Sequence, residues 1–332
     1  MDLLQRMKAK AKSKQKTLVL PEGTDLRIIK AAKCVVEEEL ASSVTILGSE
    51  ADIQKLASQE GVNISRVNIL DPLASPNIEK YANEYYELRK HKGMTKEQAK
   101  KDIVVPLRWG AMMVHLGNAD ALVVGAVETT ADVLRAGLTI IGMRRGINTA
   151  SSNYILQTND TSLGANGAFI FSDAAVVPDP TPEQLADIAI ASAQACRDFF
   201  DVEPAVALLS FSTKGSGGDH PSILKVREAL SIVRAKEPGL PIDGEIQTDA
   251  ALIPSITDKK APGSPIRGKT NVMVFPDINS GNISVKLAQR LGKFDGYGPF
   301  LQGFLKPISD LSRGAQVDEI VNTCAITLAQ VK

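Results

Sequence analysis

The feature that most constrains this chain is the alternation of short apolar runs with longer helical patterns near its beginning. Apolar runs at 17–23 and 44–48 each end in glycine, which is typical of buried strands closed by a turn. Each run is followed by a helical pattern, at 26–40 and at 51–60. This order predicts parallel strands joined by right-handed crossovers in a layered α/β fold.

The same patterns continue to the C-terminus. The 332 residues fit two domains, or one large α/β unit with a cleft. The segment 210–220 is rich in glycine and serine and predicts a mobile loop after a strand. The further predicted strands are 68–72, 121–126, 154–157, 168–172, 205–210 and 271–277, and the further predicted helices are 81–90, 95–102, 182–200, 221–235 and 283–291.

The composition argues against several classes of protein. Lys plus Arg and Asp plus Glu number 38 each, so the overall charge indicates neither a nucleic-acid partner nor a membrane surface. No apolar run approaches the roughly 20 residues that span a bilayer, and residues 1–16 lack the apolar core of a secretory peptide. Three scattered cysteines and three distant histidines form no disulfide or metal pattern. We therefore expect a cytoplasmic, metal-free protein.

Hydroxyl side chains follow the clearest strand of the first part. Thr129 and Thr130 lie shortly after the strand at 121–126, and Arg135 lies one helical turn further. Ligands of open α/β sheets bind beyond the carboxyl ends of the strands, so the two threonine hydroxyls are candidates for binding a substrate. Alternatively, Thr130 caps the helix that runs to Arg135, and the two roles are compatible.

One nucleotide-binding motif occurs in the sequence but in an unsuitable context. Residues 263–270 match the pattern G-x-x-x-x-G-K-[ST] of a P-loop. A working P-loop has a strand before it and a helix after it, whose N-terminus holds the phosphates. Here a charged segment precedes the motif and the strand at 271–277 follows it. We therefore predict that this segment is not a nucleotide-binding P-loop.

The stretch 298–314 combines turn formers with reactive side chains just before the last helix. Ser312 and Arg313 precede that helix, whose first turn contains Asp318 and Glu319. The N-terminus of a helix carries unpaired N–H groups and partial positive charge, which suit a phosphate or a developing oxyanion. The alternative is an ordinary loop in which serine caps the helix and the acids complement its dipole.

Several separated motifs resemble those of one enzyme family. They are the stretches 86–93, 129–135, 243–245, 275–282 and 306–314, and they occur in the same order across the whole chain. With these motifs the chain resembles phosphate acetyltransferases. The resemblance implies reversible transfer of an acetyl group between acetyl phosphate and coenzyme A, with coenzyme A as a substrate and no tightly bound cofactor. It also implies a homodimer with small-molecule substrates.

The resemblance also implies an architecture. The expected fold is a two-domain α/β/α sandwich similar to the isocitrate/isopropylmalate dehydrogenase-like fold, with the active site in the interdomain cleft. Residues 1–146 together with 296–332 would form domain I, and residues 147–295 would form domain II.

Roles for individual residues follow from the same resemblance. Ser312 would hydrogen-bond the thiol or the tetrahedral intermediate, Arg313 would stabilise the intermediate and the phosphate, and Arg135 would bind the phosphoryl group. Arg89 would pair with a phosphate of coenzyme A. The remaining residues implied to bind substrate are Thr129, Thr130 and Asn282.

The expected catalytic base departs from the family pattern. The family places an aspartate seven residues after the serine, whereas this chain has Glu319 there, with Asp318 beside it. A glutamate can accept the same proton but reaches about one methylene further. Position favours Glu319, Asp318 stays open as an alternative, and a purely structural role at the helix dipole remains a third interpretation.

Other functions remain as alternatives. A cysteine nucleophile is not supported, because Cys324 falls on the apolar stripe of the last helix and Cys34 in the middle of another. Ser312 lacks a G-x-S-x-G elbow, so direct transfer in a ternary complex is favoured over an acyl-serine intermediate. The alternatives are an acyltransferase that prefers butyryl or another acyl group, and a non-catalytic protein that binds coenzyme A or acyl phosphates.

Overall fold

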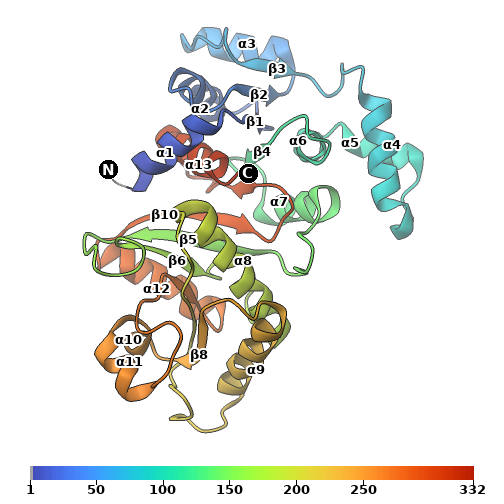
Figure 1. The fold of residues 1–332 in the computed structure, drawn as a ribbon. Coiled ribbons are helices and arrows are strands. Elements are labelled where there is room, and N and C mark those ends of the chain that lie inside the picture. Colours follow the sequence, from blue (N-terminus) through green and yellow to red (C-terminus); the bar gives the residue numbers. More distant parts are fainter. Residues whose placement is uncertain (1–2) are drawn as a thin grey trace. The chain divides into compact units, whose positions relative to one another are not determined.

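The structure is a computed structural model that describes residues 3–332, and the contacts within the chain divide it into two compact units (Figure 1). The first unit combines the residues up to Met143 with Phe304–Lys332, and the second is Arg144–Gly303. Both units contain strands and helices, so the α/β class predicted from the sequence is confirmed. No helix within residues 3–332 is both long and apolar enough to cross a membrane.

The first unit is built on a parallel sheet with the strand order β3-β2-β1-β4-β11. Its elements are α1 (Leu3–Lys14), β1 (Thr17–Leu20), α2 (Leu26–Glu37), β2 (Ser43–Leu47), α3 (Glu50–Gln59), β3 (Asn68–Leu70), α4 (Ile78–Arg89), the 3-10 turn η1 (Lys90–Lys92), α5 (Lys96–Ile103), α6 (Pro106–His115), β4 (Ala121–Val124), α7 (Thr130–Ala136), the π-helical turn η2 (Gly137–Ile141), β11 (Ile308–Asp310) and α13 (Val317–Ala329). The strands and helices expected from the apolar runs at 17–23 and 44–48 and the patterns that follow them are therefore confirmed, and their pairing is parallel.

The core of the first unit joins the beginning of the chain to its end. Leu18 of β1 aligns with Val44 of β2 on one side and with Ala121 of β4 on the other. Helix α13 packs against α1, α2 and β4, and its apolar stripe, which includes Ile320 and Cys324, is buried with the apolar side of α2. Because β11 pairs with β4 in the same sheet, the C-terminal segment reaches the carboxyl end of β4. The sheet therefore brings residues about 180 positions apart next to one another.

The second unit contains a mixed sheet with the strand order β10-β5-β6-β9-β7-β8. Strands β6, β9, β7 and β8 are parallel, whereas β10, β5 and β6 pair in antiparallel fashion. Its elements are β5 (Ser151–Gln157), β6 (Ala168–Ser172), α8 (Pro182–Phe200), β7 (Val206–Leu209), α9 (Pro221–Lys236), β8 (Ile242–Ile246), α10 (Thr248–Leu252), α11 (Pro254–Lys260), β9 (Val272–Val274), α12 (Ile278–Arg290) and β10 (Asp295–Gln302).

Strand β10 and helix α12 differ from the sequence prediction, and β8, α10 and α11 were not predicted. The glycines and proline near residue 298 predict sharp turns, yet Asp295–Gln302 is the strand β10. The register of β10 against β5 shifts between Tyr297 and Phe300, and such a bulge is where a sheet tolerates glycine and proline. Helix α12 also begins at Ile278, five residues before its predicted start, because the Asp277 side chain accepts a hydrogen bond from the Ser280 N–H and caps it.

Candidate active site

The loop between β4 and α7 is held by a buried carboxylate. Glu22, which follows β1 and is only 7% exposed, accepts hydrogen bonds from four successive backbone N–H groups, those of residues 125–128, at 2.7–3.0 Å. Gly125 has φ +117°, and a Cβ there would lie 2.3 Å from Oδ1 of Asp310. Glycine is therefore required at this position. The Glu22 carboxylate satisfies the N–H groups that a loop of this shape would otherwise leave unpaired.

The two threonines after this loop have different partners. The Thr129 side chain accepts a hydrogen bond from the Asp132 N–H at 3.2 Å and caps α7, so the expectation that Thr130 caps this helix is wrong. The Thr130 hydroxyl instead donates to Oδ2 of Asp310 at 2.5 Å. The reason is that the helix begins at Thr130, one residue earlier than a cap at Thr130 would require. Thr130 thereby links α7 to the end of β11.

Asp310 is a buried acid at the end of β11. Its side chain is 7% exposed, and Oδ1 has no hydrogen-bond partner within residues 3–332. Burial and, to a smaller extent, the negative charge of Glu22 raise the pKa of Asp310, and the hydrogen bond from Thr130 lowers it, so that the pKa is about 6. The carboxyl group of Asp310 therefore titrates much closer to neutral pH than an ordinary aspartate.

The turn that carries Ser312 and Arg313 is fastened by Arg27 at the beginning of α2. The Arg27 guanidinium donates to the carbonyl oxygens of Arg313 at 2.7 Å and of Ala315 at 2.9 Å through Nη1, and to that of Ala126 at 3.0 Å through Nη2. Its Nε and Nη2 also bind both oxygens of Asp25, the residue that caps α2. One planar side chain thus connects α2, the loop after β4 and the turn after β11.

Ser312 and Arg313 themselves are exposed at this turn. The Ser312 hydroxyl accepts a hydrogen bond from the Gly314 N–H at 3.3 Å, and the Ser312 carbonyl accepts one from the Ala315 N–H at 2.9 Å. No residue in the described part of the chain pairs with the Arg313 guanidinium. This cation is therefore available to an anionic ligand.

The first turn of α13 contains the two candidate bases. Glu319 and Asp318 are both exposed, and Oε2 of Glu319 accepts a hydrogen bond from the Gln316 N–H at 2.8 Å. Glu319 thus contributes to the start of the helix, which is the structural role considered for it above. The other oxygen, Oε1, accepts no hydrogen bond within residues 3–332. The choice between Glu319 and Asp318 stays a prediction.

The remaining predicted site residues lie on other elements. Arg135 is exposed and forms an ion pair with Asp132 at 2.6 Å, one turn earlier on α7. Arg89 is the last residue of α4. Asn282 belongs to the second unit, where its Nδ2 donates to the carbonyl of Ala174 at 3.1 Å. The first unit therefore brings together the residues of α7 and the turn after β11, whereas Arg89 comes from a separate helix.

Sequence patterns missed Glu22, Arg27 and Asp310 as residues that shape this site. Each acts through partners that are remote in the sequence, at separations of about 100 to 290 residues. A local signal did exist for Asp310, because it lies inside the matching stretch 306–314. Glu22 stands between a proline and a glycine at the end of β1, which marks a turn but indicates no partner.

The motif at 243–245 serves to anchor the glycine- and serine-rich loop. Glu245 accepts hydrogen bonds from the Gly215 N–H at 2.7 Å, from the Ser212 hydroxyl at 3.0 Å and from Nε of Arg227 at 2.8 Å. Burial acts to raise the pKa of Glu245, but these hydrogen bonds together lower it to about 2. The segment 210–220, expected to be mobile, is therefore tied to the end of β8 by an ionised carboxylate.

The thiols and the possible metal ligands give no second reactive centre. Burial raises the pKa of Cys196 to about 12 and raises that of Cys324 as well, so neither side chain supplies a thiolate near neutral pH. Within residues 3–332 no group of three or more His, Cys, Asp or Glu side chains is arranged to hold a metal ion. The segment 263–270 is followed by β9 and not by a helix, which confirms that it is not a P-loop.

Comparisons with known proteins agree on one family. A family model described as phosphate acetyl/butaryl transferase matches residues 2–328. The chain is 52% identical to the phosphate acetyltransferase of Treponema pallidum (strain Nichols), and the match covers 99% of both chains. Its structure is similar to that of the EutD phosphotransacetylase from Staphylococcus aureus, with a TM-score of 0.91, 37% identity, and coverage of 100% of this chain and 98% of the other.

A more distant likeness concerns the fold alone. The structure of a putative 4-hydroxythreonine-4-phosphate dehydrogenase from Salmonella typhimurium matches with a TM-score of 0.57 at 13% identity, over 95% of this chain and 99% of that one. A likeness to a dehydrogenase fold, which the family resemblance implied, is thus seen at the level of the fold.

Proposed function

Because the chain belongs to the phosphate acetyl/butaryl transferase family and functions as a phosphate acetyltransferase, we propose that it transfers the acetyl group by direct attack of the coenzyme A thiolate on acetyl phosphate. The reaction is reversible: acetyl phosphate and coenzyme A give acetyl-CoA and inorganic phosphate. The observation that carries this proposal is the turn after β11, which Arg27 fastens while the Arg313 guanidinium stays without a partner in the described part of the chain.

In this mechanism a carboxylate of α13 prepares the nucleophile. Only a few per cent of a free thiol is ionised at pH 7, so a base that removes its proton accelerates attack. Glu319 is the proposed base, with Asp318 as the alternative. The sulfur forms a bond to the acetyl carbon, whose carbonyl electrons move onto oxygen. When the tetrahedral intermediate collapses, the bond from carbon to the phosphate oxygen breaks, and its electron pair leaves with phosphate.

The charge that develops during this reaction is stabilised by cations and hydroxyl groups. The Arg313 guanidinium stabilises the oxyanion and the departing phosphate, and Ser312 donates a hydrogen bond to the intermediate. Arg135 binds the phosphoryl group, exchanging its exposed ion pair with Asp132 for the substrate. Arg89 binds a phosphate of coenzyme A. The proposed contacts to acetyl phosphate are completed by Thr129, Thr130 and Asn282.

The test is acetyl-CoA formation followed at 233 nm, in the wild type and in the variants Glu319→Ala and Asp318→Ala. Loss of a general base lowers turnover by about 10²- to 10⁴-fold, so only Glu319→Ala should show such a loss. If Asp318→Ala loses turnover instead, the proposed reaction stands and Asp318 is the base. Equal turnover of both variants and the wild type would leave the two carboxylates with structural roles only.

The acyl group and the possibility of binding without turnover are tested in the same assay. A butyryl-preferring acyltransferase would turn over butyryl phosphate faster than acetyl phosphate at equal concentration. Binding of coenzyme A without turnover of either acyl phosphate would support the non-catalytic alternative. We expect acetyl phosphate to be the better substrate.

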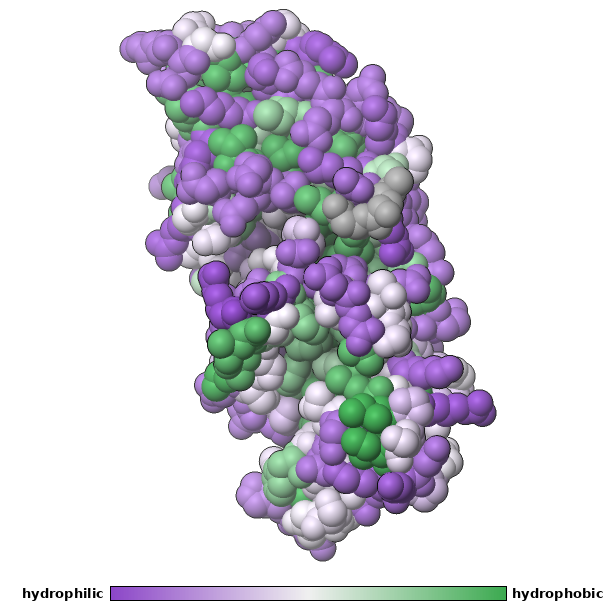
Figure 2. All heavy atoms as spheres, turned by 90° about the vertical axis from the view of Figure 1, so that its left-hand side faces the viewer, coloured by the Kyte–Doolittle hydropathy of each residue, from purple (hydrophilic) through white to green (hydrophobic). Residues whose placement is uncertain are grey.

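We also propose that the enzyme is a homodimer that acts in the cytoplasm. Helix α12 and its C-cap residue present an apolar stripe of Ile283, Leu287 and Leu291, which are spaced four residues apart and 50–77% exposed. Figure 2 shows hydrophobic side chains gathered among polar ones on the side of the second unit where Figure 1 draws α10, α11 and α12. The three free cysteines suit a reducing compartment.

The oligomeric state is tested by light scattering of the purified protein. Leu287→Glu should convert a dimer into a monomer, because a charge would have to be buried at the interface. Leu73→Glu, which changes a 72% exposed leucine of the first unit, is the matched control and should stay dimeric. A monomeric wild type, or a dimeric Leu287→Glu variant, would contradict the proposal.

A further inference from the structure

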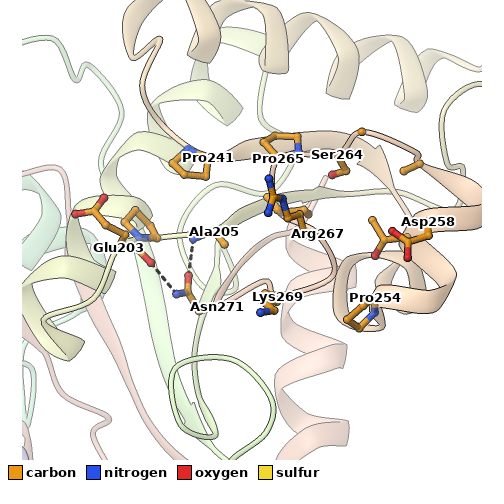
Figure 3. Close-up of a pocket in the computed structure, with 15 residues that line it drawn as sticks. Glu203, Ala205, Pro241, Pro254, Asp258, Ser264, Pro265, Arg267, Lys269 and Asn271 are labelled. Atoms are coloured by element: carbon orange, nitrogen blue, oxygen red, sulfur yellow. Dashed lines mark hydrogen bonds between the residues drawn. The ribbon is translucent and has the colours of Figure 1, made fainter.

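A cavity of about 900 Å³ opens in the second unit at the amino ends of three parallel strands (Figure 3). Pro204 and Ala205 precede β7, Pro241 precedes β8 and Asn271 precedes β9, and all four residues line the cavity. The carboxyl ends of these strands lead instead to the loop at 210–220 and to α12. The cavity is therefore at the edge of the sheet opposite to the one where substrates of open α/β sheets are expected.

The other wall of the cavity is the segment 263–269, the P-loop match that the fold excludes as a P-loop. Its backbone is well fastened: the Ser264 N–H donates to the Ala261 carbonyl at 3.1 Å, and the Lys269 N–H to the Ile266 carbonyl at 2.9 Å. A Cβ at Gly268 would lie 2.6 Å from the backbone of α11, so this loop is packed closely against that helix. The side chains on this wall consequently project from a fixed backbone.

Two cationic side chains of this wall lack partners. Arg267 and Lys269 are exposed, and neither forms an ion pair or hydrogen bond through its side chain within residues 3–332. Ser264 belongs to the same wall, but its hydroxyl oxygen is buried beneath the surface. The two cations are therefore the side chains of this wall that can pair with an anion in the cavity.

The two acidic residues of the lining do not neutralise the positive charge of these cations at the centre of the cavity. Glu203 already pairs with Nη2 of Arg197 at 3.3 Å. In the close-up Glu203 and Asp258 lie at opposite ends of the lining, with Arg267 between them (Figure 3). The middle of the cavity therefore presents positive charge, while its ends carry acceptors.

The rest of the lining is apolar and stiff. Proline rings from Pro204, Pro241, Pro254 and Pro265 contribute to it, together with Ile266. Such rings offer rigid apolar surface to a flat ring, and about 900 Å³ is at the upper end of the range for drug-sized ligands. Arginine and lysine are common ligands of a phosphate ester.

We propose that this cavity binds a nucleoside monophosphate or a similar small molecule that joins a planar ring to a phosphate. Arg267 and Lys269 hold the phosphate, and the prolines contact the ring. The site is separate from the proposed transfer of acetyl groups, so it does not depend on the roles assigned to Ser312 or Arg313.

The experiment is calorimetric titration of the full chain with uridine 5′-monophosphate and, for comparison, with uridine. Wild type should bind the nucleotide, and uridine should bind at least about tenfold more weakly, because it lacks the phosphate. Arg267→Ala should weaken nucleotide binding by about tenfold or more, while Arg290→Ala, which removes an arginine of α12 outside the cavity, should not. The variant Arg313→Ala should bind the nucleotide as the wild type does.

Lys269→Ala separates a ligand contact from a structural role. Lys269 is exposed and its side chain has no partner within residues 3–332, so the melting temperature of the free protein should stay the same while nucleotide affinity falls severalfold. The proposal is overturned if wild type does not bind the nucleotide, or if Arg267→Ala and Lys269→Ala both bind it within twofold of wild type. It is also overturned if Arg313→Ala, and not Arg267→Ala, abolishes binding, since the nucleotide would then occupy the proposed active site.

Discussion

Replacing Glu22 with glutamine tests how the loop between β4 and α7 is held. The Glu22 carboxylate accepts four backbone N–H groups at 2.7–3.0 Å, two on each oxygen, from a position that is 7% exposed. Glutamine keeps the shape of the side chain, but its NH2 group meets two N–H donors and can accept from neither. Two buried donors therefore lose their acceptor, and the other two lose a charged one.

The expected cost can be worked out from these contacts. A buried donor left without a partner costs about 1–3 kcal/mol, and the effects of neighbouring donors are not fully additive. Glu22→Gln should thus lower the free energy of unfolding by roughly 2–5 kcal/mol. For a unit of this size that corresponds to a fall in melting temperature of about 5–15 °C.

Two measurements check this prediction. Thermal unfolding followed by circular dichroism reports the global cost, and hydrogen–deuterium exchange reports whether the amides of residues 125–128 lose protection. Glu50→Gln, at an exposed glutamate in the first turn of α3, is the matched control and should leave both measurements unchanged. The reasoning is refuted if Glu22→Gln melts within about 2 °C of the wild type and its loop amides exchange at the wild-type rate.

Three further perturbations follow from the same contacts. Arg27→Lys keeps the charge, but a lysine cannot reach three carbonyl oxygens and Asp25 at once. Turnover should therefore fall about 10- to 100-fold, with little change in KM for acetyl phosphate. Unchanged turnover would show that Arg27 does not position the turn after β11. Because burial raises the pKa of Asp310 to about 6, the folded state holds that proton more tightly than the unfolded chain, and the resulting stability is lost as pH rises through 4 to 6. Asp310→Asn, which mimics the protonated form, should therefore be more stable than wild type at pH 8, on the order of 2 kcal/mol, and should lose this advantage near pH 4; an equal difference in urea unfolding at both pH values would contradict this. The pKa of Glu245 is lowered to about 2. The stability that its ionised carboxylate gives the folded protein is therefore present above pH 4.5 and is lost as pH falls toward 2. Glu245→Gln should destabilise the protein at pH 7 and much less at pH 2.5, and a loss that does not depend on pH would indicate a packing effect instead.

Most of the elements could be predicted from local patterns. Helix α8 begins at Pro182 and ends at Phe200, as predicted, because a threonine caps it and proline suits a first helical position. The strand β10 could not be predicted, because its glycines and proline are local signals for a turn. Only the pairing with β5, which tolerates a register shift at that point, makes this segment a strand.

Part of the candidate site could likewise be predicted from the sequence, and part could not. Its reactive side chains could be named in advance, because Ser312, Arg313 and the acids of α13 lie together in one short stretch. The choice between Thr129 and Thr130 as the helix cap could not, because either threonine satisfies the local pattern. The contact of Thr130 with Asp310 decides it, across 180 residues of sequence.

The sequence by itself determined the α/β class, the parallel order of the first strands and the family motifs, because periodicity and spacing are local properties that each segment carries alone. Only the tertiary structure decided which groups hold the site together. Glu22 meets the loop at 125–128 because β1 and β4 are adjacent in the sheet, and Arg27 meets the turn after β11 because α2 packs beside α13. Such contacts join groups whose sequence neighbourhoods contain no sign of one another, so they exist only once the sheet has formed.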